Sequence, residues 1–171
     1  MINYDLTKIR AMAFDVDGVL SNPLIILMGG NPVRTAHIKD GYALNQAAKL
    51  GYQLAIITGG KGEQTVERYS ALGFQDIYLN CSIKIDTLEA WMNKYGLKPD
   101  EVLYVGDDIP DYQAMKRVGC SCCPSDAAVE IKEIATYVSP YGGGGGCVRD
   151  VVEQVLRAQG KWMSSAEAFG W

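Results

Sequence analysis

Asp15-Val16-Asp17-Gly18-Val19 follows directly on the apolar residues 9–14, and this junction decides the fold. The apolar residues predict a buried strand, and side chains alternate along a strand, so Asp15 and Asp17 point the same way. Gly18 allows the chain to turn sharply behind them. Such a pair can hold a divalent cation and still offer one oxygen for attack on phosphorus. The alternative is an Asp-rich surface turn without chemistry.

Composition predicts an ordinary globular protein of one domain. The chain has 171 residues, of which 48% are hydrophobic and 21% charged, enough for a sizeable core. The net charge of −4 argues against a nucleic-acid-binding surface. Residues 1–5 lack the features of a signal peptide, and no apolar stretch approaches the length of a membrane span. We therefore expect neither a nucleic-acid partner nor a membrane.

The five cysteines suggest a reducing compartment. Their number is odd and no secretory context accompanies them, so a cytoplasmic location is expected. Cys120-Ser121-Cys122-Cys123 contains a C-x-x-C spacing, but zinc needs further ligands and His37 is the single histidine. A redox cysteine normally begins a helix, whereas residues 124–126 resemble a helix start after the cysteines. We predict small buried residues on a late strand.

Predicted strands and helices alternate along the chain. Strands are expected at residues 9–14, 24–28, 33–38, 52–57, 76–79, 101–105, 120–123 and 135–138, with 24–38 forming a β-hairpin around a Gly-rich turn. Helices are expected at residues 41–50, 62–72, 84–95, 111–118, 126–134 and 148–159. This order predicts an α/β protein, a three-layer Rossmann-like parallel sheet with helices on both faces. Residues 161–171 remain unassigned.

The glycine run at residues 142–146 has two interpretations. It is either a flexible loop before the last helix, or a backbone that must closely approach a ligand or a neighbouring chain.

Four strand ends carry matched polar groups. These are Asp15 and Asp17; Thr58-Gly59-Gly60; Lys84; and Gly106-Asp107-Asp108, with Asp111 nearby. In a parallel sheet such groups converge on one rim, where ligands bind. Each has a structural alternative: a strand-end threonine, a solvated lysine, or aspartates that cap a helix. Their joint occurrence favours a site.

This set suits phosphoryl transfer. Mg²⁺ held by Asp15 and Asp107, with the backbone carbonyl of Asp17, would offset the charge of a phosphate ester. Asp15 would attack phosphorus and form an aspartyl-phosphate. Thr58 and Lys84 would hold the phosphoryl oxygens, and Lys84 could also anchor Asp15. Asp17 would protonate the leaving alcohol and then activate water.

The chain resembles the haloacid dehalogenase superfamily of phosphotransferases. The resemblance rests on residues 15–19, Ile57-Thr58-Gly59, Lys84 and Gly106-Asp107-Asp108. It implies the fold of that superfamily, and Asp17 implies a phosphatase rather than a dehalogenase. Most members insert a cap domain, but the gap between residues 79 and 84 is too short for one. A single capless domain over residues 1–171 is therefore expected.

An apolar hairpin without a cap invites association between subunits; the alternative is a hairpin folded back on its own core. The arrangement resembles the capless 3-deoxy-D-manno-octulosonate 8-phosphate phosphatases, on Lys39, Asp40-Gly41-Tyr42, the glycine run and Cys147-Val148-Arg149. This resemblance implies a homotetramer in which hairpins cover neighbouring sites. It also implies hydrolysis of an eight-carbon acid sugar phosphate in lipopolysaccharide (Kdo) biosynthesis.

The carboxylate of such a sugar would need a basic partner. Lys61, Arg68 and Arg149, or Arg34 and Lys39 from the hairpin, are candidates, and arginine matches a carboxylate best. We expect Arg149, Arg68 and Lys61 to bind substrate together with Thr58 and Gly59. The family usually has an arginine at the position of Gly60, and glutamine and glycine at those of Leu79 and Asn80.

Three alternatives remain open from sequence. A phosphatase for a nine-carbon neuraminate-type 9-phosphate would fit the same reaction. A phospho-acceptor receiver domain would need an aspartate after the third sheet strand, where Leu79-Asn80-Cys81 offers none. A binding module that kept only the fold would not need the full set of polar groups.

Overall fold

A parallel sheet forms the centre of the computed structural model, which describes residues 1–29 and 31–170. Within these residues six strands lie in the order β5-β4-β1-β6-β7-β8, with every described pairing parallel. The strands are β1 (Ala11–Phe14), β4 (Gln53–Ile57), β5 (Asp76–Tyr78), β6 (Val102–Val105), β7 (Cys120–Cys123) and β8 (Tyr137–Val138). Strand β1 lies centrally and is buried along its whole length.

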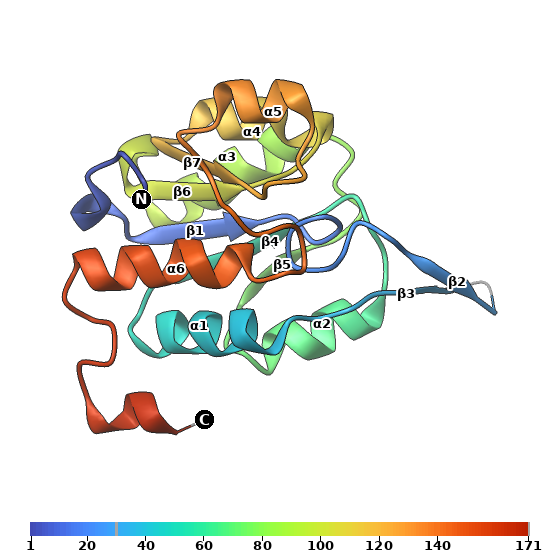
Figure 1. Ribbon diagram of the computed structural model, residues 1–171. Coiled ribbons are helices and arrows are strands. Elements are labelled where there is room, and N and C mark those ends of the chain that lie inside the picture. The colour runs from blue at the N-terminus through green and yellow to red at the C-terminus, as the bar shows by residue number, and fades with distance from the viewer. Residues whose placement is uncertain (30, 171) are drawn as a thin grey trace.

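Helices cover both faces of the sheet (Figure 1). One face carries α1 (Ile38–Lys49), α2 (Glu63–Ser70) and α6 (Cys147–Ala158); the other carries α3 (Lys84–Tyr95), α4 (Tyr112–Arg117) and α5 (Val129–Ile134). Short 3₁₀ turns lie at Leu6–Lys8, Pro99–Glu101, Ile109–Asp111 and Ala166–Phe169. The predicted three-layer α/β fold is confirmed, and no cap domain is inserted in the part of the chain that the structure describes.

Alternation along β1 divides the core into two layers. Met12 and Phe14 pack with α1 and α6, whereas Ala11 and Ala13 join the cluster around the fully buried Trp91. Burying one large apolar side chain contributes roughly 1.5–3 kcal/mol. The predicted apolar face of the last helix is also buried: Val148, Val151, Val152, Val155 and Leu156 are inaccessible to solvent.

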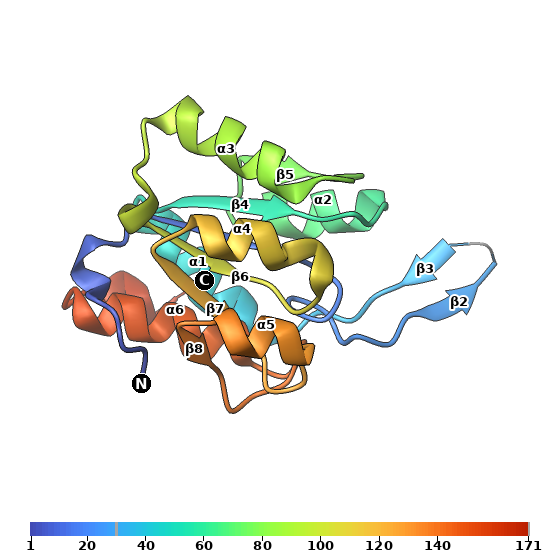
Figure 2. The ribbon, with the colours of Figure 1, turned by 90° about the horizontal axis from the view of Figure 1, so that it is seen from above.

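The predicted β-hairpin extends away from the body of the molecule (Figures 1 and 2). It comprises β2 (Ile26–Met28) and β3 (Asn31–Val33), paired antiparallel; residue 30 of the predicted turn lies outside the described residues. Leu24 is 78% exposed and Leu27 is 86% exposed. A hairpin folded back on its own core is therefore wrong, and its apolar side chains stand open to solvent.

Several element boundaries differ from the predictions. The hairpin strands are shorter, because residues 34–37 lead into α1 instead. Helix α1 begins at Ile38 rather than residue 41, since His37 caps it by accepting from the Asp40 N–H. Helix α5 begins at Val129 rather than residue 126, because the Asp126 side chain accepts from the Gly143 N–H instead.

The unassigned C-terminal segment folds back on its own chain. Trp162 meets Tyr42 edge-on with 5.9 Å between ring centroids, and the Tyr42 hydroxyl donates to the carbonyl of Ala168. The segment therefore covers α1; residue 171 lies outside the described residues.

The cysteines of β7 are confirmed as buried strand residues. All five cysteines are free thiols, and burial raises the pKa of Cys123 to about 11. A reactive thiol would need the opposite shift. No helix in the described ranges is both long and apolar enough to cross a membrane.

Candidate active site

The polar groups at the strand ends meet in one hollow, as predicted. Its volume is about 430 Å³, and it lies beyond the carboxyl ends of β1, β4 and β6. Its lining includes the following sequence-predicted residues: Asp15, Asp17, Thr58, Gly59, Lys84 and Asp107. The parallel topology places these side chains together although they come from distant parts of the chain.

Asp15 is held on both oxygens. Its Oδ1 accepts from the Val16 N–H at 2.6 Å, and its Oδ2 lies 2.7 Å from Nζ of Lys84. Burial raises the pKa of Asp15 most strongly, nearby Asp111 also raises it, and Lys84 lowers it, so that the pKa is about 6. The carboxylate is therefore ionised at neutral pH and fixed in place, as a nucleophile must be.

Lys84 bridges two acids rather than one. Its Nζ also lies 2.7 Å from Oδ1 of Asp111, which accepts from the Tyr104 hydroxyl at 2.8 Å. The other Asp111 oxygen accepts from the Asp107 N–H at 3.1 Å. Asp111, fully buried, thus links Lys84 to the loop after β6. Sequence reasoning noted Asp111 only as a neighbouring acid, because its spacing equally fits a helix cap.

Three carboxylates fit a divalent cation. Asp15, Asp107 and Asp111 each offer an oxygen, and these atoms lie within 4.8 Å of one another. Oδ1 of Asp107 is buried and has no hydrogen-bond partner among the described residues. Burial raises the pKa of Asp107 to about 8, with Asp15 as the next cause. A bound cation would supply the missing partner and offset this charge, so the residues fit Mg²⁺.

Gly18 is required for this arrangement. Its φ is +82°, and a Cβ there would lie 2.0 Å from Oδ2 of Asp107. Any other residue would strain the backbone and displace the carboxylate. Glycine is therefore needed at this position for two reasons: the predicted turn, and the space that the Asp107 carboxylate occupies.

The Asp17 carboxylate lines the same hollow but does not belong to the cluster of Asp15, Asp107 and Asp111. Arg34 grips it with Nε–Oδ1 at 2.6 Å and Nη2–Oδ2 at 2.9 Å, and the Ser21 hydroxyl donates to Oδ1 at 3.3 Å. This leaves only the backbone carbonyl of Asp17 for the predicted cation role. Sequence reasoning named Arg34 as one of several basic residues, and no local signal connects a hairpin arginine to Asp17.

Thr58 joins two loops at the rim. It is 3% exposed, its Oγ1 accepts from the Gly60 N–H at 3.1 Å, and its carbonyl accepts from the Cys81 N–H at 2.9 Å. The Thr58 hydroxyl is thus fixed at the hollow, where a phosphoryl oxygen can meet it.

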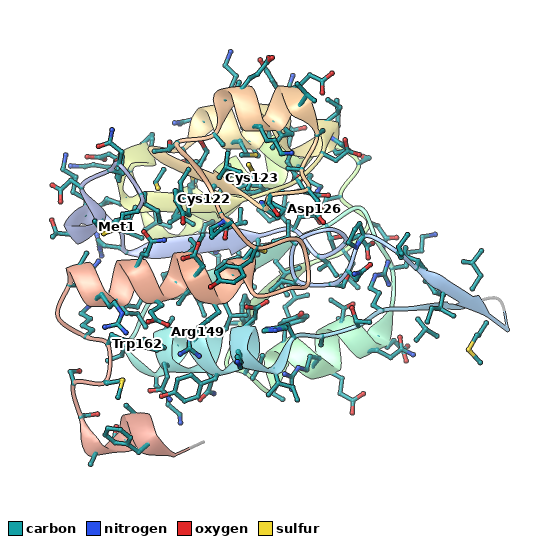
Figure 3. The ribbon with its side chains drawn as sticks, viewed as in Figure 1. Met1, Cys122, Cys123, Asp126, Arg149 and Trp162 are labelled. Carbon is teal, nitrogen blue, oxygen red and sulfur yellow. The ribbon has the colours of Figure 1, made fainter. Side chains whose placement is uncertain are left out.

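None of the three basic residues predicted to bind substrate is among the residues that line this hollow. Lys61 is exposed. Arg68 lines a second hollow of about 290 Å³ between the hairpin and α2. Arg149 pairs with Glu153 at 2.7 Å and lies 4.5 Å from the Trp162 ring (Figure 3). Single-chain geometry therefore does not support these contacts, which stay predictions.

The glycine run makes a close backbone contact within its own chain. The Gly144 N–H donates to the Val19 carbonyl at 2.9 Å, and a Cβ on Gly143 would lie 1.9 Å from the Gly18 carbonyl oxygen. The run thus supports the loop that carries Asp15 and Asp17. The observed contact is to the same chain, so close approach to a ligand or a neighbouring chain stays a prediction.

Known proteins share this sequence and fold. Residues 36–124 match the haloacid dehalogenase-like hydrolase family. The chain is 37% identical over 155 residues to 3-deoxy-D-manno-octulosonate 8-phosphate phosphatase KdsC of Escherichia coli (strain K12), covering 90% of this chain and 82% of that protein.

Solved structures agree with this match. The 3-deoxy-D-manno-octulosonate 8-phosphate phosphatase of Yersinia pestis superposes with a TM-score of 0.89 at 32% identity, covering 92% of this chain and 85% of that one. The Moraxella catarrhalis phosphatase, in complex with magnesium, phosphate and KDO, gives a TM-score of 0.92 at 29% identity, covering 97% and 96%. The chain therefore belongs to the haloacid dehalogenase-like hydrolases, in the family of the 3-deoxy-D-manno-octulosonate 8-phosphate phosphatases.

Proposed function

We propose that this protein is a magnesium-dependent phosphatase that hydrolyses 3-deoxy-D-manno-octulosonate 8-phosphate in lipopolysaccharide biosynthesis. One observation carries the proposal: Asp15 lies 2.7 Å from the Lys84 ammonium and belongs to an acid cluster in which Oδ1 of Asp107 has no hydrogen-bond partner among the described residues. The names of the relatives supply the substrate, and the Moraxella catarrhalis structure contains magnesium, phosphate and the product sugar.

In the first half-reaction Asp15 attacks phosphorus. A bond forms between a carboxylate oxygen and phosphorus, the bond from phosphorus to the sugar oxygen breaks, and Asp17 gives its proton to that oxygen. Thr58 and Lys84 hold the phosphoryl oxygens as charge develops on them. Asp15, Asp107 and the carbonyl of Asp17 would hold magnesium, because both oxygens of the third acid, Asp111, already accept hydrogen bonds. The bound cation would supply charge neutralisation and alignment of the phosphate.

In the second half-reaction water displaces the Asp15 carboxylate from phosphorus. Asp17 takes a proton from water as the water oxygen attacks phosphorus, and the bond between phosphorus and Asp15 breaks. Inorganic phosphate leaves, and both aspartates return to their starting states. Lys84 holds Asp15 in place through both steps.

The organisation proposed for the protein is a single capless domain over residues 1–171 that assembles as a homotetramer in the cytoplasm. The exposed apolar hairpin and the uncovered hollow support association, because hairpins from neighbouring chains would exclude water from phospho-aspartate chemistry. Leu27→Ser should convert the assembly to smaller species in analytical ultracentrifugation and lower activity. Val129→Ser, which changes a residue 67% exposed on α5, is the matched control. An unaltered assembly in Leu27→Ser would contradict this organisation.

A panel of phosphate esters with Mg²⁺ tests the function, with released phosphate as the readout. We expect the highest kcat/KM for the eight-carbon 8-phosphate and loss of turnover after chelation by EDTA. Preference for a nine-carbon 9-phosphate would favour the second substrate; the departures at Gly60, Leu79 and Asn80 leave the identity of the sugar open. A protein inert toward every ester would overturn the reaction class.

A further inference from the structure

The side chain of Arg34, in the hairpin segment, contacts the carboxylate of Asp17, the proposed proton donor and acceptor. Arg34 is the first residue after β3, and its guanidinium meets Asp17 through two parallel hydrogen bonds of 2.6 and 2.9 Å. A third donor, Nη1, reaches the Lys61 carbonyl at 2.7 Å. The Arg34 side chain is 14% exposed and that of Asp17 is 30% exposed. This is a bidentate, partly buried ion pair.

Gly60 provides the space that the guanidinium occupies. A Cβ on Gly60 would lie 2.7 Å from Nη2 of Arg34, 3.2 Å from Oδ2 of Asp17 and 3.4 Å from Oγ1 of Thr58. The φ of Gly60 lies outside the left-handed region, so glycine is favoured here by space and not by backbone conformation: a larger residue would displace the Arg34 guanidinium. Arg34 and any side chain at position 60 compete for one place beside Asp17.

The pair restricts how Asp17 can move. The carboxylate stands at the rim of the hollow, where an unsupported side chain would sample several rotamers. The Arg34 fork constrains both oxygens, and the Ser21 hydroxyl touches Oδ1. Arginine stays protonated at all working pH values, so it cannot itself exchange the proton with substrate or water. Its effect on the reaction must act through Asp17.

We propose that Arg34 is the positioning residue of Asp17, that it acts from the hairpin, and that Gly60 is glycine to admit it. This inference rests on the proposed acid–base function of Asp17. It ties the hairpin to the chemistry of its own chain through one side chain. Positioning a proton-transfer group to within a fraction of an ångström is what such a supporting contact contributes.

Arg34→Ala tests the inference through the leaving group. With Mg²⁺, single-turnover cleavage of 4-nitrophenyl phosphate should stay within about 2-fold of wild type, because that leaving group needs little protonation. Cleavage of phenyl phosphate should fall by about 10-fold or more, within the range of general acid catalysis. Release of 4-nitrophenol should begin with a burst, and the steady-state rate that follows should be lower than in wild type, because the second step still needs Asp17 as base. KM for both esters should change little. Arg34→Lys, which keeps the charge but not the fork, should be intermediate.

Exchanging the two positions tests the role of Gly60. Gly60→Arg alone should lower phenyl phosphate cleavage, because two guanidinium groups then compete for one space. Arg34→Ala combined with Gly60→Arg should recover at least about 3-fold over Arg34→Ala, because a guanidinium again lies beside Asp17. A double variant no more active than Arg34→Ala would overturn the assignment of Gly60.

Arg117→Ala is the matched control, because Arg117 forms a half-exposed pair with Glu89 away from the hollow; it should leave both rates unchanged. Thermal unfolding of every variant separates misfolding from mispositioning. If folded Arg34→Ala lost the same factor in cleavage rate on both aryl esters, or lost none, the positioning role would be overturned. The activity of the wild type would still support the phosphatase function. A wild type inert toward both esters would instead refute the proposed function.

Discussion

Nζ of Lys84 lies 2.7 Å from Oδ2 of Asp15, and the same nitrogen lies 2.7 Å from Oδ1 of Asp111. One buried ammonium thus pairs with two buried acids. The attraction of both carboxylates raises the pKa of Lys84 although burial alone would lower it. The lysine is therefore held charged, and the nucleophile is held still.

Lys84→Met should cost both stability and activity. It leaves Asp15 and Asp111 buried without a counter-charge, which typically costs about 3–5 kcal/mol of unfolding free energy. It also raises the pKa of Asp15, so the acid limb of the activity profile should move to higher pH. Chemical denaturation and kcat against pH measure the two effects. Lys8→Met, at an exposed pair with Asp100, should change neither; an equally stable Lys84→Met would contradict the network.

Asp15→Asn should abolish phosphate release. The amide has nearly the same shape but cannot form the acyl-phosphate, so kcat should fall by at least about 10⁴-fold, as expected when a covalent route is removed. Phosphate release with Mg²⁺ is the measurement. Turnover near the wild-type rate would exclude Asp15 as nucleophile.

Asp17→Asn should trap the phosphorylated protein. Without a base the second half-reaction slows by about 10²–10⁴-fold, whereas 4-nitrophenyl phosphate can still phosphorylate Asp15. Intact-mass measurement after rapid quenching should therefore find one added phosphoryl group. Losing the Arg34 partner also predicts a lower melting temperature. Finding no phosphorylated protein, despite a burst of 4-nitrophenol, would contradict this role.

The metal-free protein should lose stability as the pH rises. Folding raises the pKa of Asp107 to about 8 and that of Asp15 to about 6, from about 3.9 in an unfolded chain. The folded state binds these protons more tightly, so their contribution is complete below about pH 4 and is lost as the pH passes about 6 and then about 8.

Melting temperatures in EDTA at several pH values measure this dependence. Asp107→Asn stays neutral and should melt higher than wild type at about pH 8.5, with little difference near pH 5. Added Mg²⁺ should raise the melting temperature of wild type far more than that of Asp107→Asn. A wild type that is most stable at high pH without metal would contradict the prediction.

Arg149→Ala should lower stability and affect the acid sugar phosphate most. Arg149 pairs with Glu153 and stacks on Trp162, so its loss should loosen the C-terminal segment and lower the melting temperature. The substrate contact predicted from sequence should make the loss of kcat/KM larger for the acid sugar phosphate than for 4-nitrophenyl phosphate. Equal losses on both esters would remove Arg149 from substrate recognition and leave it a role in stability.

Local patterns were enough to predict most secondary structure. The run before Asp15 gave the central strand, and the apolar spacing around Val152 gave the last helix. The predicted start of α5 was wrong because a side chain there has a distant partner. Asp126 does not begin α5 because Gly143 binds it, and no window of neighbouring residues contains that information.

From sequence alone came the α/β class, the parallel sheet and the gathering of Asp15, Thr58, Lys84 and Asp107 at one rim. Strand order and strand polarity force that gathering, so residue types at strand ends suffice to foresee it. Only the folded chain decided that Asp111 holds Lys84 and that Arg34 holds Asp17. These pairs join segments far apart in the chain, and their formation depends on side-chain directions and on the empty space at Gly60. Such contacts arise from packing, which no periodicity in a sequence encodes.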